Sequence, residues 1–551
     1  MRVLGVNALF HDPAAALVVD GQVLAAAEEE RFSRRKHGKR PVPFSAWELP
    51  DQAMTWCLAE AGLRPQDLDA VAYGVDPALA APAASLGLAD PWDHLRWTYA
   101  QNVAGFLRTS LPGLDPATVR YVPHHVAHAA SAALASPHRV CSVLVLDGRG
   151  ERHSHLAGRY DHGRLEILAS QELPDSLGLL YESLTEHLGF LRSSDEYKVM
   201  ALASYGKPRF LEELRQTVRT TGDGGFLAPV PDWSLWARRR GRGDEEWDEV
   251  HADLASSVQA RVEEVLLELA TWLRERTGDS ALTLAGGVAL NCVASSRLWR
   301  EAGFDDVWVQ PAAGDAGTAL GAALQVAADL GDVVAPMPDA GLGRQWSDDE
   351  LAAWLRAARV PFTTPADLPG EVADALAADA VVAWFDGRSE FGPRALGHRS
   401  LLAHPGVADN VERLNVVKGR EQFRPVAPMV RADRARELFE GGPIPSPYML
   451  FVHQVRPAWR DRIPAVVHVD GTARIQTVED DGSRLARLLD AFEQRTGLPV
   501  LVNTSLNIAG RPMVDDPRDA LELFGSAPVD LLVLGPHLVR RAGLFAQGGA
   551  G

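Results

Sequence analysis

The chain has 551 residues, of which 46% are hydrophobic and 23% charged, as in an ordinary soluble globular protein. This length exceeds what one hydrophobic core organises, so we expect two domains. The formal net charge of −18 disfavours a nucleic-acid partner, because an acidic surface repels a phosphate backbone.

The cysteines and the first residues bear on the compartment. Three cysteines lie far apart without a CxxC pair, which argues against a disulfide framework, a cysteine zinc site and a redox pair. The N-terminus is a poor signal peptide, and no run approaches the roughly 20 apolar residues of a membrane span. We therefore expect a cytoplasmic protein with no membrane partner; any self-association is expected to give a homodimer.

The opening segment predicts three strands. They cover Arg2 to Asn7, Ala15 to Val19 and Gln22 to Ala27, and Asp20-Gly21 is typical of a two-residue hairpin turn between the last two. The loop after the first strand contains Phe10-His11-Asp12-Pro13.

Two later segments resemble this opening. Val140 to Leu146 predicts a buried strand that ends in the loop Asp147-Gly148-Arg149-Gly150, and Leu282 to Leu284 ends similarly at Ala285-Gly286-Gly287. A module that combines a strand, a loop with an acidic residue or glycines, and a hairpin thus occurs more than once. This repetition predicts a duplicated α/β fold of the sugar-kinase, actin and Hsp70 kind, although the sequence itself shows no visible repeat.

The middle of the chain predicts a long helix preceded by an insertion. His251 to Thr277 has helical apolar spacing and stops at Gly278. Thr220 to Glu249 contains three tryptophans and a basic run, which indicates a lid or an ordered insertion. For the basic run at 238–242, a solvated surface is favoured about two to one over a phosphate patch.

A domain boundary is predicted where the pattern breaks at Val333 to Trp346. The expected domains are residues 1–340 and 347–545, with strands of the second near Val381 to Phe385 and Val500 to Val502. The last residues, Ala546 to Gly551, are rich in glycine and alanine and are expected to be disordered.

A histidine cluster gives the first chemical signal. His124 and His128 would share one face of a helix, but His125 and His128 would as well, and spacing alone does not choose between the pairs. Asp147 and Asp315 are carboxylates in glycine loops, where the backbone can approach a ligand. Two histidines with two aspartates favour divalent iron or manganese.

Glycine loops and arginines give the second signal. Gly286-Gly287 and Gly314 to Gly317 precede helices and would present backbone N–H groups to an anion. Arginines also gather around Gly-Pro turns at 387–400, at 418–425 and at 470–474, and the series ends in Asn503 to Asn507. In so acidic a chain, this series predicts a bound phosphate or carbonate group.

Several N-terminal blocks and the C-terminal arginine segments, in this order along the chain, resemble the NodU/CmcH family of O-carbamoyltransferases nearly end to end. The N-terminal blocks that match are Phe10-His11-Asp12, Glu28 to Phe32, Arg35-Lys36-His37-Gly38, His124 to Ala129, Asp147 to Glu151, Ser176-Leu177-Gly178 and Asp195 to Met200. The resemblance implies an actin/Hsp70-class, Kae1-like N-terminal domain and a YrdC-like C-terminal α/β domain.

The resemblance also implies a reaction. ATP, with Mg, and carbamoyl phosphate form carbamoyl adenylate in the C-terminal domain, and the N-terminal domain passes the carbamoyl group to a small-molecule hydroxyl. The residues that it implies are His124, His128, Asp147 and Asp315 for the metal, Fe(II) or another divalent ion; Lys36, Gly178, Gly287 and Asn291 for carbamoyl adenylate; His11 as the base; and Arg394, Lys418, Arg424, Arg474 and Asn503 for ATP and carbamoyl phosphate.

The acceptor is less specified. The segment between Asn7 and His11 is short for an aminoglycoside-type member, and Trp233, Trp236 and Trp247 would suit a polyketide or macrolide antibiotic or its sugar, although tryptophans packed at the surface are the commoner case. Arg511 stands where relatives have another residue and receives no role.

Two other functions remain at this point. A tRNA threonylcarbamoyl-transfer protein would contain both domain types, but the chain has no basic stripe. A non-catalytic, nucleotide-gated binding protein would need only the actin/Hsp70-like core, and it would leave the C-terminal arginines unexplained.

Overall fold

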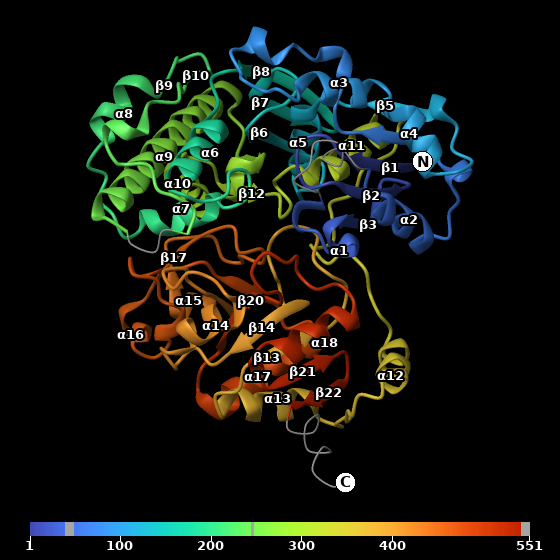
Figure 1. The fold of residues 1–551 in the computed structure, drawn as a ribbon, viewed down its shortest axis with the longest axis vertical. Helices are drawn as coiled ribbons and strands as arrows, with labels where there is room; N and C mark the ends of the chain where they lie inside the picture. Colours follow the sequence, from blue (N-terminus) through green and yellow to red (C-terminus); the bar gives the residue numbers. More distant parts are fainter. Residues whose placement is uncertain (39–48, 244–246, 542–551) are drawn as a thin grey trace. The chain divides into compact units, whose positions relative to one another are not determined.

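The computed structural model describes residues 1–38, 49–243 and 247–541. The chain divides into two compact units, Met1–Asp339 and Ala340–Gly551 (Figure 1). Among the described residues, every helix is too short or too polar to cross a membrane. The segment expected to be disordered, 546–551, lies outside the described residues.

The N-terminal unit contains two five-stranded sheets with the same strand pattern. In the first, β1 pairs antiparallel with β2 and β2 with β3, while β4 and β5 continue parallel to β1. In the second, β6, β7 and β8 form the antiparallel part, and β11 and β12 continue parallel to β6. The strands are β1 Arg2–Asn7, β2 Ala14–Val19, β3 Gln22–Glu28, β4 Ala70–Tyr73, β5 Val119–Tyr121, β6 Val140–Leu146, β7 His153–Asp161, β8 Arg164–Glu172, β11 Ala281–Ala285 and β12 Asp306–Val309.

This shared order confirms the predicted duplication and the predicted strands. The turn at Asp20-Gly21 has φ of 50° and 75°, as a two-residue hairpin turn requires. One detail differs from the expectation: the strand at 282–284 begins no hairpin but is β11, a parallel strand of the second sheet. The hairpin modules therefore begin at β1 and β6.

Two helices lie between the sheets. Helix α11 (Ala316–Asp329) packs against β1, β2 and β4, helix α5 (His124–Ala133) packs against β6, β7 and β11, and the two helices pack against each other (Figure 1). Glycines make this layer thin, because a Cβ on Gly5 would lie 1.8 Å from the Ala319 oxygen and one on Gly321 would lie 1.8 Å from the Ala127 oxygen. The start of each helix is thereby fixed against the other.

The predicted long helix is α9 (Glu249–Thr277), which ends at Gly278 with φ of 70°. Before it, the insertion forms the short strands β9 (Arg219–Thr220) and β10 (Phe226–Leu227). The remaining helices of this unit are α1 Glu30–Ser33, α2 Asp51–Glu60, α3 Asp93–Gln101, α4 Val103–Ser110, α6 Leu177–His187, α7 Glu196–Ala203, α8 Leu211–Thr217 and α10 Cys292–Glu301.

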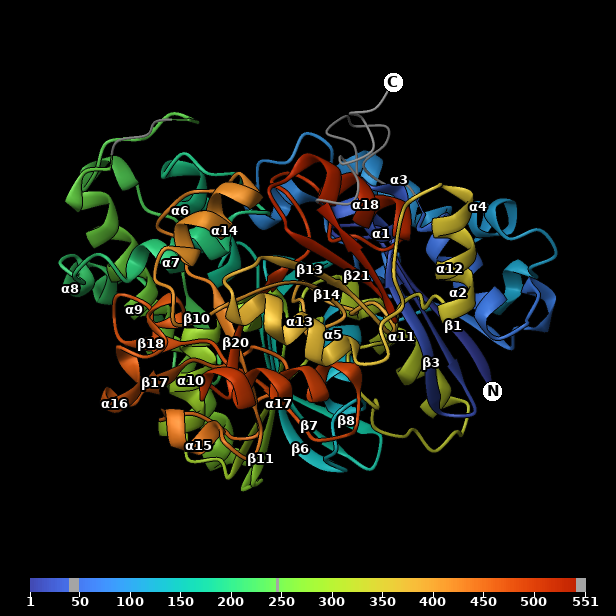
Figure 2. The same cartoon turned by 90° about the horizontal axis from the view of Figure 1, so that it is seen from below.

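The C-terminal unit is built on a seven-stranded mixed sheet in the order β19-β15-β20-β14-β13-β21-β22, with a small sheet β16-β17-β18. Figure 2 shows β13, β14 and β21 of the large sheet with α13 and α17, which pack against each other. The strands are β13 Val382–Phe385, β14 Arg399–Ala403, β15 Ala427–Arg431, β16 Phe439–Glu440, β17 His453–Val455, β18 Thr472–Ala473, β19 Gln476–Val478, β20 Val500–Ser505, β21 Leu531–Leu534 and β22 His537–Arg540. The helices are α12 Asp348–Ala357, α13 Leu368–Ala377, α14 Asn410–Lys418, α15 Ala435–Leu438, α16 Pro457–Arg460, α17 Arg484–Thr496 and α18 Pro517–Ser526.

The contact between α5 and α11 can be tested at its glycine. Gly321→Ala should destabilise the N-terminal unit by about 3 kcal/mol, because the added methyl overlaps the Ala127 oxygen and the Ser131 nitrogen. Gly105→Ala in α4 is the matched control, since its Cβ meets nothing within 4 Å, and it should be neutral or stabilising. Urea unfolding followed by circular dichroism measures both; equal stabilities would contradict the tight packing.

Candidate metal and carbamoyl-transfer site

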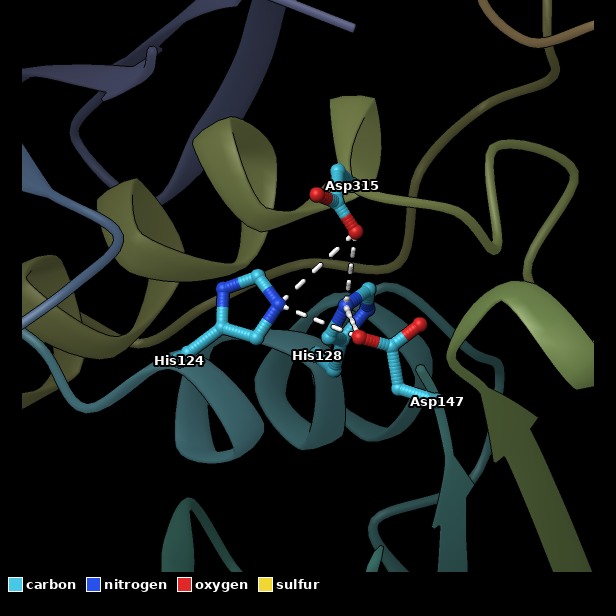
Figure 3. A group of neighbouring side chains, drawn as sticks. All are labelled: His124, His128, Asp147 and Asp315. Atoms are coloured by element: carbon cyan, nitrogen blue, oxygen red, sulfur yellow. Dashed lines mark hydrogen bonds and ion pairs between the residues drawn. The ribbon is translucent and has the colours of Figure 1, made fainter. Parts of the chain in front are cut away.

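Four buried side chains converge where α5, β6 and α11 meet. His124 and His128 stand one turn apart at the start of α5, Asp147 directly follows β6, and Asp315 directly precedes α11. Figure 3 shows both imidazole rings and both carboxylates pointing toward a common centre. The group therefore combines segments that are far apart in sequence and that the α5–α11 packing brings together.

The spacing of the ligand atoms suits a bound metal better than direct hydrogen bonds. The Nε2 atom of His124 lies 3.3 Å from Asp147 Oδ2 and 3.7 Å from Asp315 Oδ1, and the Nε2 atom of His128 lies 3.8 and 3.6 Å from the same oxygens. Ligands about 2.1 Å from one metal ion lie about 3.4 Å apart at tetrahedral angles, whereas N–H···O bonds are usually about 2.9 Å. These atoms can hold one divalent cation.

The buried nitrogen atoms of His128 also favour a metal-binding site. Both ring nitrogens of His128 are buried and have no hydrogen-bond partner among the described residues. A buried polar atom without a partner is costly, so a structure that keeps one usually binds something there. A mixed nitrogen and oxygen donor set is typical of iron, manganese or zinc.

The surrounding backbone orients the ligands. His124 Nδ1 lies 3.3 Å from the Gly74 carbonyl oxygen, which leaves Nε2 directed at the centre. Asp147 accepts the backbone N–H of Gly287 at 2.9 Å through Oδ1, and its other oxygen faces the histidines. Glu151 accepts the backbone N–H of His124 at 2.8 Å and so fixes the first residue of α5.

The two carboxylates favour a proton on the His124 imidazole. Burial alone would lower the pKa of His124, but the hydrogen bond to Asp147 and the charges of Asp315 and Asp147 outweigh it and raise the pKa to about 9. In turn, the hydrogen bond to His124 and the charges of the neighbouring histidines lower the pKa of Asp147 despite its burial. A divalent cation would take the place of the proton on His124 and bring positive charge to the carboxylates.

The structure separates His125 from this group. Its ring is buried against Gly150, where an added Cβ would lie 2.7 Å from Nδ1, and it is not among the described side chains that could share a cation. Burial lowers its pKa well below the usual value, so the ring is neutral. The pair that faces the carboxylates is therefore His124 with His128, which the sequence spacing left open.

Two of the predicted carbamoyl-adenylate residues border Asp147. Gly178, the second residue of α6, lies so close to the loop after β6 that a Cβ would be 2.7 Å from the Asp147 backbone oxygen, and the backbone N–H of Gly287 donates to the Asp147 carboxylate. Asn291 is turned away from them: its amide exchanges two hydrogen bonds with Gln259, and its oxygen accepts the N–H of Ala294 at the start of α10. Its predicted contact with carbamoyl adenylate stays a prediction.

His11 and Lys36 gather in a second cluster. His11 Nδ1 lies 2.8 Å from Asp12 Oδ2, and Lys36 Nζ donates to Ser194 Oγ at 3.4 Å. Phe10, the residue before His11, packs edge-on against the His124 ring with 5.1 Å between centroids. The predicted base therefore follows directly on a residue that contacts a predicted metal ligand.

Sequence reasoning passed over several members of these clusters. His37 and Ser194 bond to each other beside His11, and Glu151 supports α5, although only Glu151 and His37 stood in blocks that marked the resemblance. His37 could have been identified by its place between Lys36 and Gly38; Ser194 gave no signal, because a serine in a loop is unremarkable in any chain.

The tryptophans of the insertion pack internally. Trp233 is buried, donates its Nε1–H to Ser183 Oγ and packs against Trp236, while Trp247 stacks under the Arg240 guanidinium at 3.4 Å. These contacts favour the interpretation as an ordered insertion, and the three rings give no support to a polyketide acceptor.

In the C-terminal unit, the predicted phosphate-binding residues come from segments linked through β20. Asn503 donates to the Ala395 oxygen, beside Arg394, and to Gln476, two residues after Arg474. Arg474 Nε is buried and lacks a hydrogen-bond partner among the described residues, and the same holds for the Asn503 side-chain oxygen. Unsatisfied buried donors and acceptors at one place are consistent with a polar ligand.

The other two cations are engaged by the chain. Lys418 Nζ donates to the oxygens of Ser505 and Asn507, and Arg424 Nη1 lies 3.5 Å from a Glu421 carboxylate oxygen. Lys418 thus braces the end of β20. Its direct contact with ATP or carbamoyl phosphate stays a prediction.

Comparison with known families places the chain in one of them. Residues 2–81, 96–228 and 234–324 match the carbamoyltransferase N-terminus, and residues 373–541 match the carbamoyltransferase C-terminus. The chain belongs to the carbamoyltransferase family and is an enzyme of that class.

Two relatives indicate which members of the family the chain is similar to. Nodulation protein NolNO of Sinorhizobium fredii is 38% identical over 97% of this chain and 80% of its own length. Nodulation protein U of Bradyrhizobium diazoefficiens is 33% identical over 95% of both chains. This carbamoyltransferase is thus related to the NodU and NolO proteins.

Among solved structures, a ROK hexokinase from Thermus thermophilus matches at 16% identity with a TM-score of 0.31, covering 60% of this chain and 100% of that chain. A similarity this low is no evidence for the duplication, which we infer from the strand order of the two sheets.

Metal loading tests the four-residue group. The chain should bind about one equivalent of Fe(II) or Mn(II), and His128→Asn or Asp315→Asn should weaken binding more than about 100-fold by removing a ligand. His138→Asn is the control, because that ring pairs with Asp306 elsewhere on the unit. Metal content after dialysis is measured by mass spectrometry; full loading in both ligand variants would contradict the site.

Metal affinity should also depend on pH. With the His124 pKa at about 9, the ring is protonated at pH 7.5 and must lose its proton to bind a metal. Affinity should therefore rise about tenfold per pH unit between pH 7 and 9, and binding should release about one proton from this residue. Calorimetry in buffers of different ionisation enthalpy counts the protons; pH-independent affinity would contradict the assignment.

Proposed function

We propose that this carbamoyltransferase works in two steps at two sites. Its C-terminal unit, which we take to be YrdC-like, makes carbamoyl adenylate and pyrophosphate from ATP, with Mg, and carbamate derived from carbamoyl phosphate. Its N-terminal unit, which we take to be Kae1-like, transfers the carbamoyl group to a hydroxyl of a small molecule. The observation that carries the proposal is the buried His124, His128, Asp147 and Asp315 group in a chain that matches both halves of the family.

The donor set fits a divalent cation, for which we propose Fe(II). Such an ion would supply positive charge to the phosphate of carbamoyl adenylate and so assist departure of AMP. The chain contributes groups of its own here, since the backbone of Gly178 and Gly287 borders Asp147 closely, with no side chain to obstruct the approach of a phosphate. Lys36, near Ser194, adds a positive charge on the side of His11.

His11 is proposed to take the proton of the attacking hydroxyl. Alcohols are very weak acids, so a neutral imidazole beside the oxygen accelerates attack by about 10² to 10⁴. The hydroxyl oxygen bonds to the carbamoyl carbon, the bond from that carbon to the phosphate oxygen breaks, and AMP leaves with the electron pair. Nothing in this step requires nucleic acid, and the net charge of −18 is unfavourable for tRNA.

The two sites should be separable by substitution. With ATP, carbamoyl phosphate and Fe(II), the chain should form carbamoyl adenylate without an acceptor, and His11→Asn should keep this activity while losing about 10²-fold or more of transfer. Arg474→Ala and Arg424→Ala should do the reverse, losing about 10²-fold in adenylate formation, the scale of one charge-assisted hydrogen bond.

Arg487→Ala is the control for the two arginine variants, because this arginine lies on α17, outside the predicted phosphate-binding segments. Mass spectrometry of carbamoyl adenylate and a pyrophosphate assay report the first step, and AMP release from supplied carbamoyl adenylate reports the second. Loss of both activities in His11→Asn would overturn the two-site assignment.

A further inference from the structure

A single carboxylate lies between two imidazole rings beside the metal-binding group. Asp12 Oδ2 is 2.8 Å from His11 Nδ1, and Asp12 Oδ1 is 2.8 Å from His37 Nδ1. The ring centroids of the two histidines are 4.3 Å apart. All three side chains are between a quarter and a third exposed, so a substrate can approach them. Asp12 thus uses both oxygens, one for each ring.

The second ring is anchored on its far side as well. His37 Nε2 lies 2.8 Å from Ser194 Oγ, which also receives a hydrogen bond from Lys36, and the backbone N–H of His37 donates to Glu30 at 2.7 Å. Both nitrogen atoms of the His37 ring therefore have a partner, Asp12 for Nδ1 and Ser194 for Nε2.

The distances identify hydrogen bonds rather than a second metal site. His11, Asp12 and His37 are close enough to share a cation in principle. Yet both of their nitrogen–oxygen distances are 2.8 Å, the length of an N–H···carboxylate bond, while the corresponding distances in the His124 group are 3.3 to 3.8 Å. The hydrogen must then sit on Nδ1 of each ring, which places the basic lone pair of His11 on Nε2.

The backbone is shaped to hold this arrangement. Asp12 has φ of 43° and His37 has φ of 62°, in the left-handed region that non-glycine residues seldom adopt. The buried Asn7 amide donates to the carbonyl oxygens of His11 and Asp12 at 2.7 and 2.9 Å and so fixes the turn. Strained backbone held in place by specific bonds is common where side chains are positioned for a reaction.

We propose that Asp12, supported by His37 and Ser194, is the positioning group of the base His11. This inference rests on the proposed function of His11. When the acceptor hydroxyl attacks carbamoyl adenylate, its proton moves to His11 Nε2, AMP departs with the electrons of the broken bond, and the new imidazolium remains bonded through Nδ1–H to the Asp12 carboxylate. The carboxylate stabilises that cation without taking a proton itself.

Charged groups of both signs surround the pair. Asp12 bonds to both rings, and Lys36 stands beside the serine that bonds to His37. The Glu30 carboxylate accepts the backbone N–H of His37, and Glu196, whose pKa burial raises to about 7, interacts electrostatically with His11. Asp12 is the carboxylate bonded to His11 Nδ1, where it would stabilise an imidazolium formed during transfer.

Histidine-selective nuclear magnetic resonance tests this arrangement without an acceptor. In the full chain, ¹⁵N shifts should show His11 and His37 both protonated at Nδ1, and Asp12→Asn should lower the pKa of His11 by about one unit or more, because its opposite charge is lost. His162, which bonds to Asp161 on the surface at 2.6 Å, is the internal control and should not change. A proton on Nε2 of His11, or an unshifted His11 in Asp12→Asn, overturns the proposal.

Kinetics supplies the second measurement, with AMP release from supplied carbamoyl adenylate and water as the acceptor. Asp12→Asn should lower the rate by about 10²-fold or more and move the acid limb of its pH profile to lower pH. His37→Gln, the variant to use if Asp12→Asn does not fold, should lower the rate about tenfold. An unchanged profile in both variants, or a second equivalent of tightly bound metal that His37→Gln abolishes, overturns the proposal.

The proposed function fails in a different way. If His11→Asn transfers normally, His11 is not the base, whatever Asp12 does. If His11→Asn abolishes transfer while the Asp12 and His37 variants behave as wild type, the two-site function stands and only the positioning role falls. Carbamoyl adenylate formation, measured in the His11, Asp12 and His37 variants, should remain at the wild-type level.

Discussion

The buried group of two histidines and two aspartates depends on the close contact between helices α5 and α11. With glycine at position 321, the second helix lies against the carbonyl of Ala127, in the middle of the first, and Gly5 lets it lie equally close to strand β1. This contact sets the distance between Asp315 at the start of α11 and the histidines at the start of α5. A methyl group added at either glycine would overlap the carbonyl oxygen that faces it and would push α11 away.

Two clusters with different physical character result, adjoining each other through the packing of Phe10 on His124. In one, nitrogen and oxygen atoms stand 3.3 to 3.8 Å apart and leave buried atoms of His128 unsatisfied, which is the geometry of a cation site. In the other, the contacts are 2.8 Å and the atoms are bonded to one another, which is the geometry on which we base the proposed positioning of His11. Histidines and aspartates thus form two clusters whose nitrogen–oxygen distances differ.

Much of the local structure could be predicted. The strand Arg2–Asn7, the hairpin turn at Asp20 and the helix ending before Gly278 follow from apolar periodicity and from turn chemistry, which act over a few residues. Other features could not. The bonding of Asn291 to Gln259 and the packing of the insertion's tryptophans on their neighbours had no signal in the sequence. Those outcomes depend on partners far along the chain.

The sequence by itself determined the residue types of the site, the elements that bear them and the family to which they belong, because each is encoded in short motifs. Only the tertiary structure decided that His124, rather than His125, faces the two aspartates, and that Asp12 joins His11 to His37. The physical reason is that a helix brings both candidate histidines near the site, while the rotation of the helix is set by packing against a distant one.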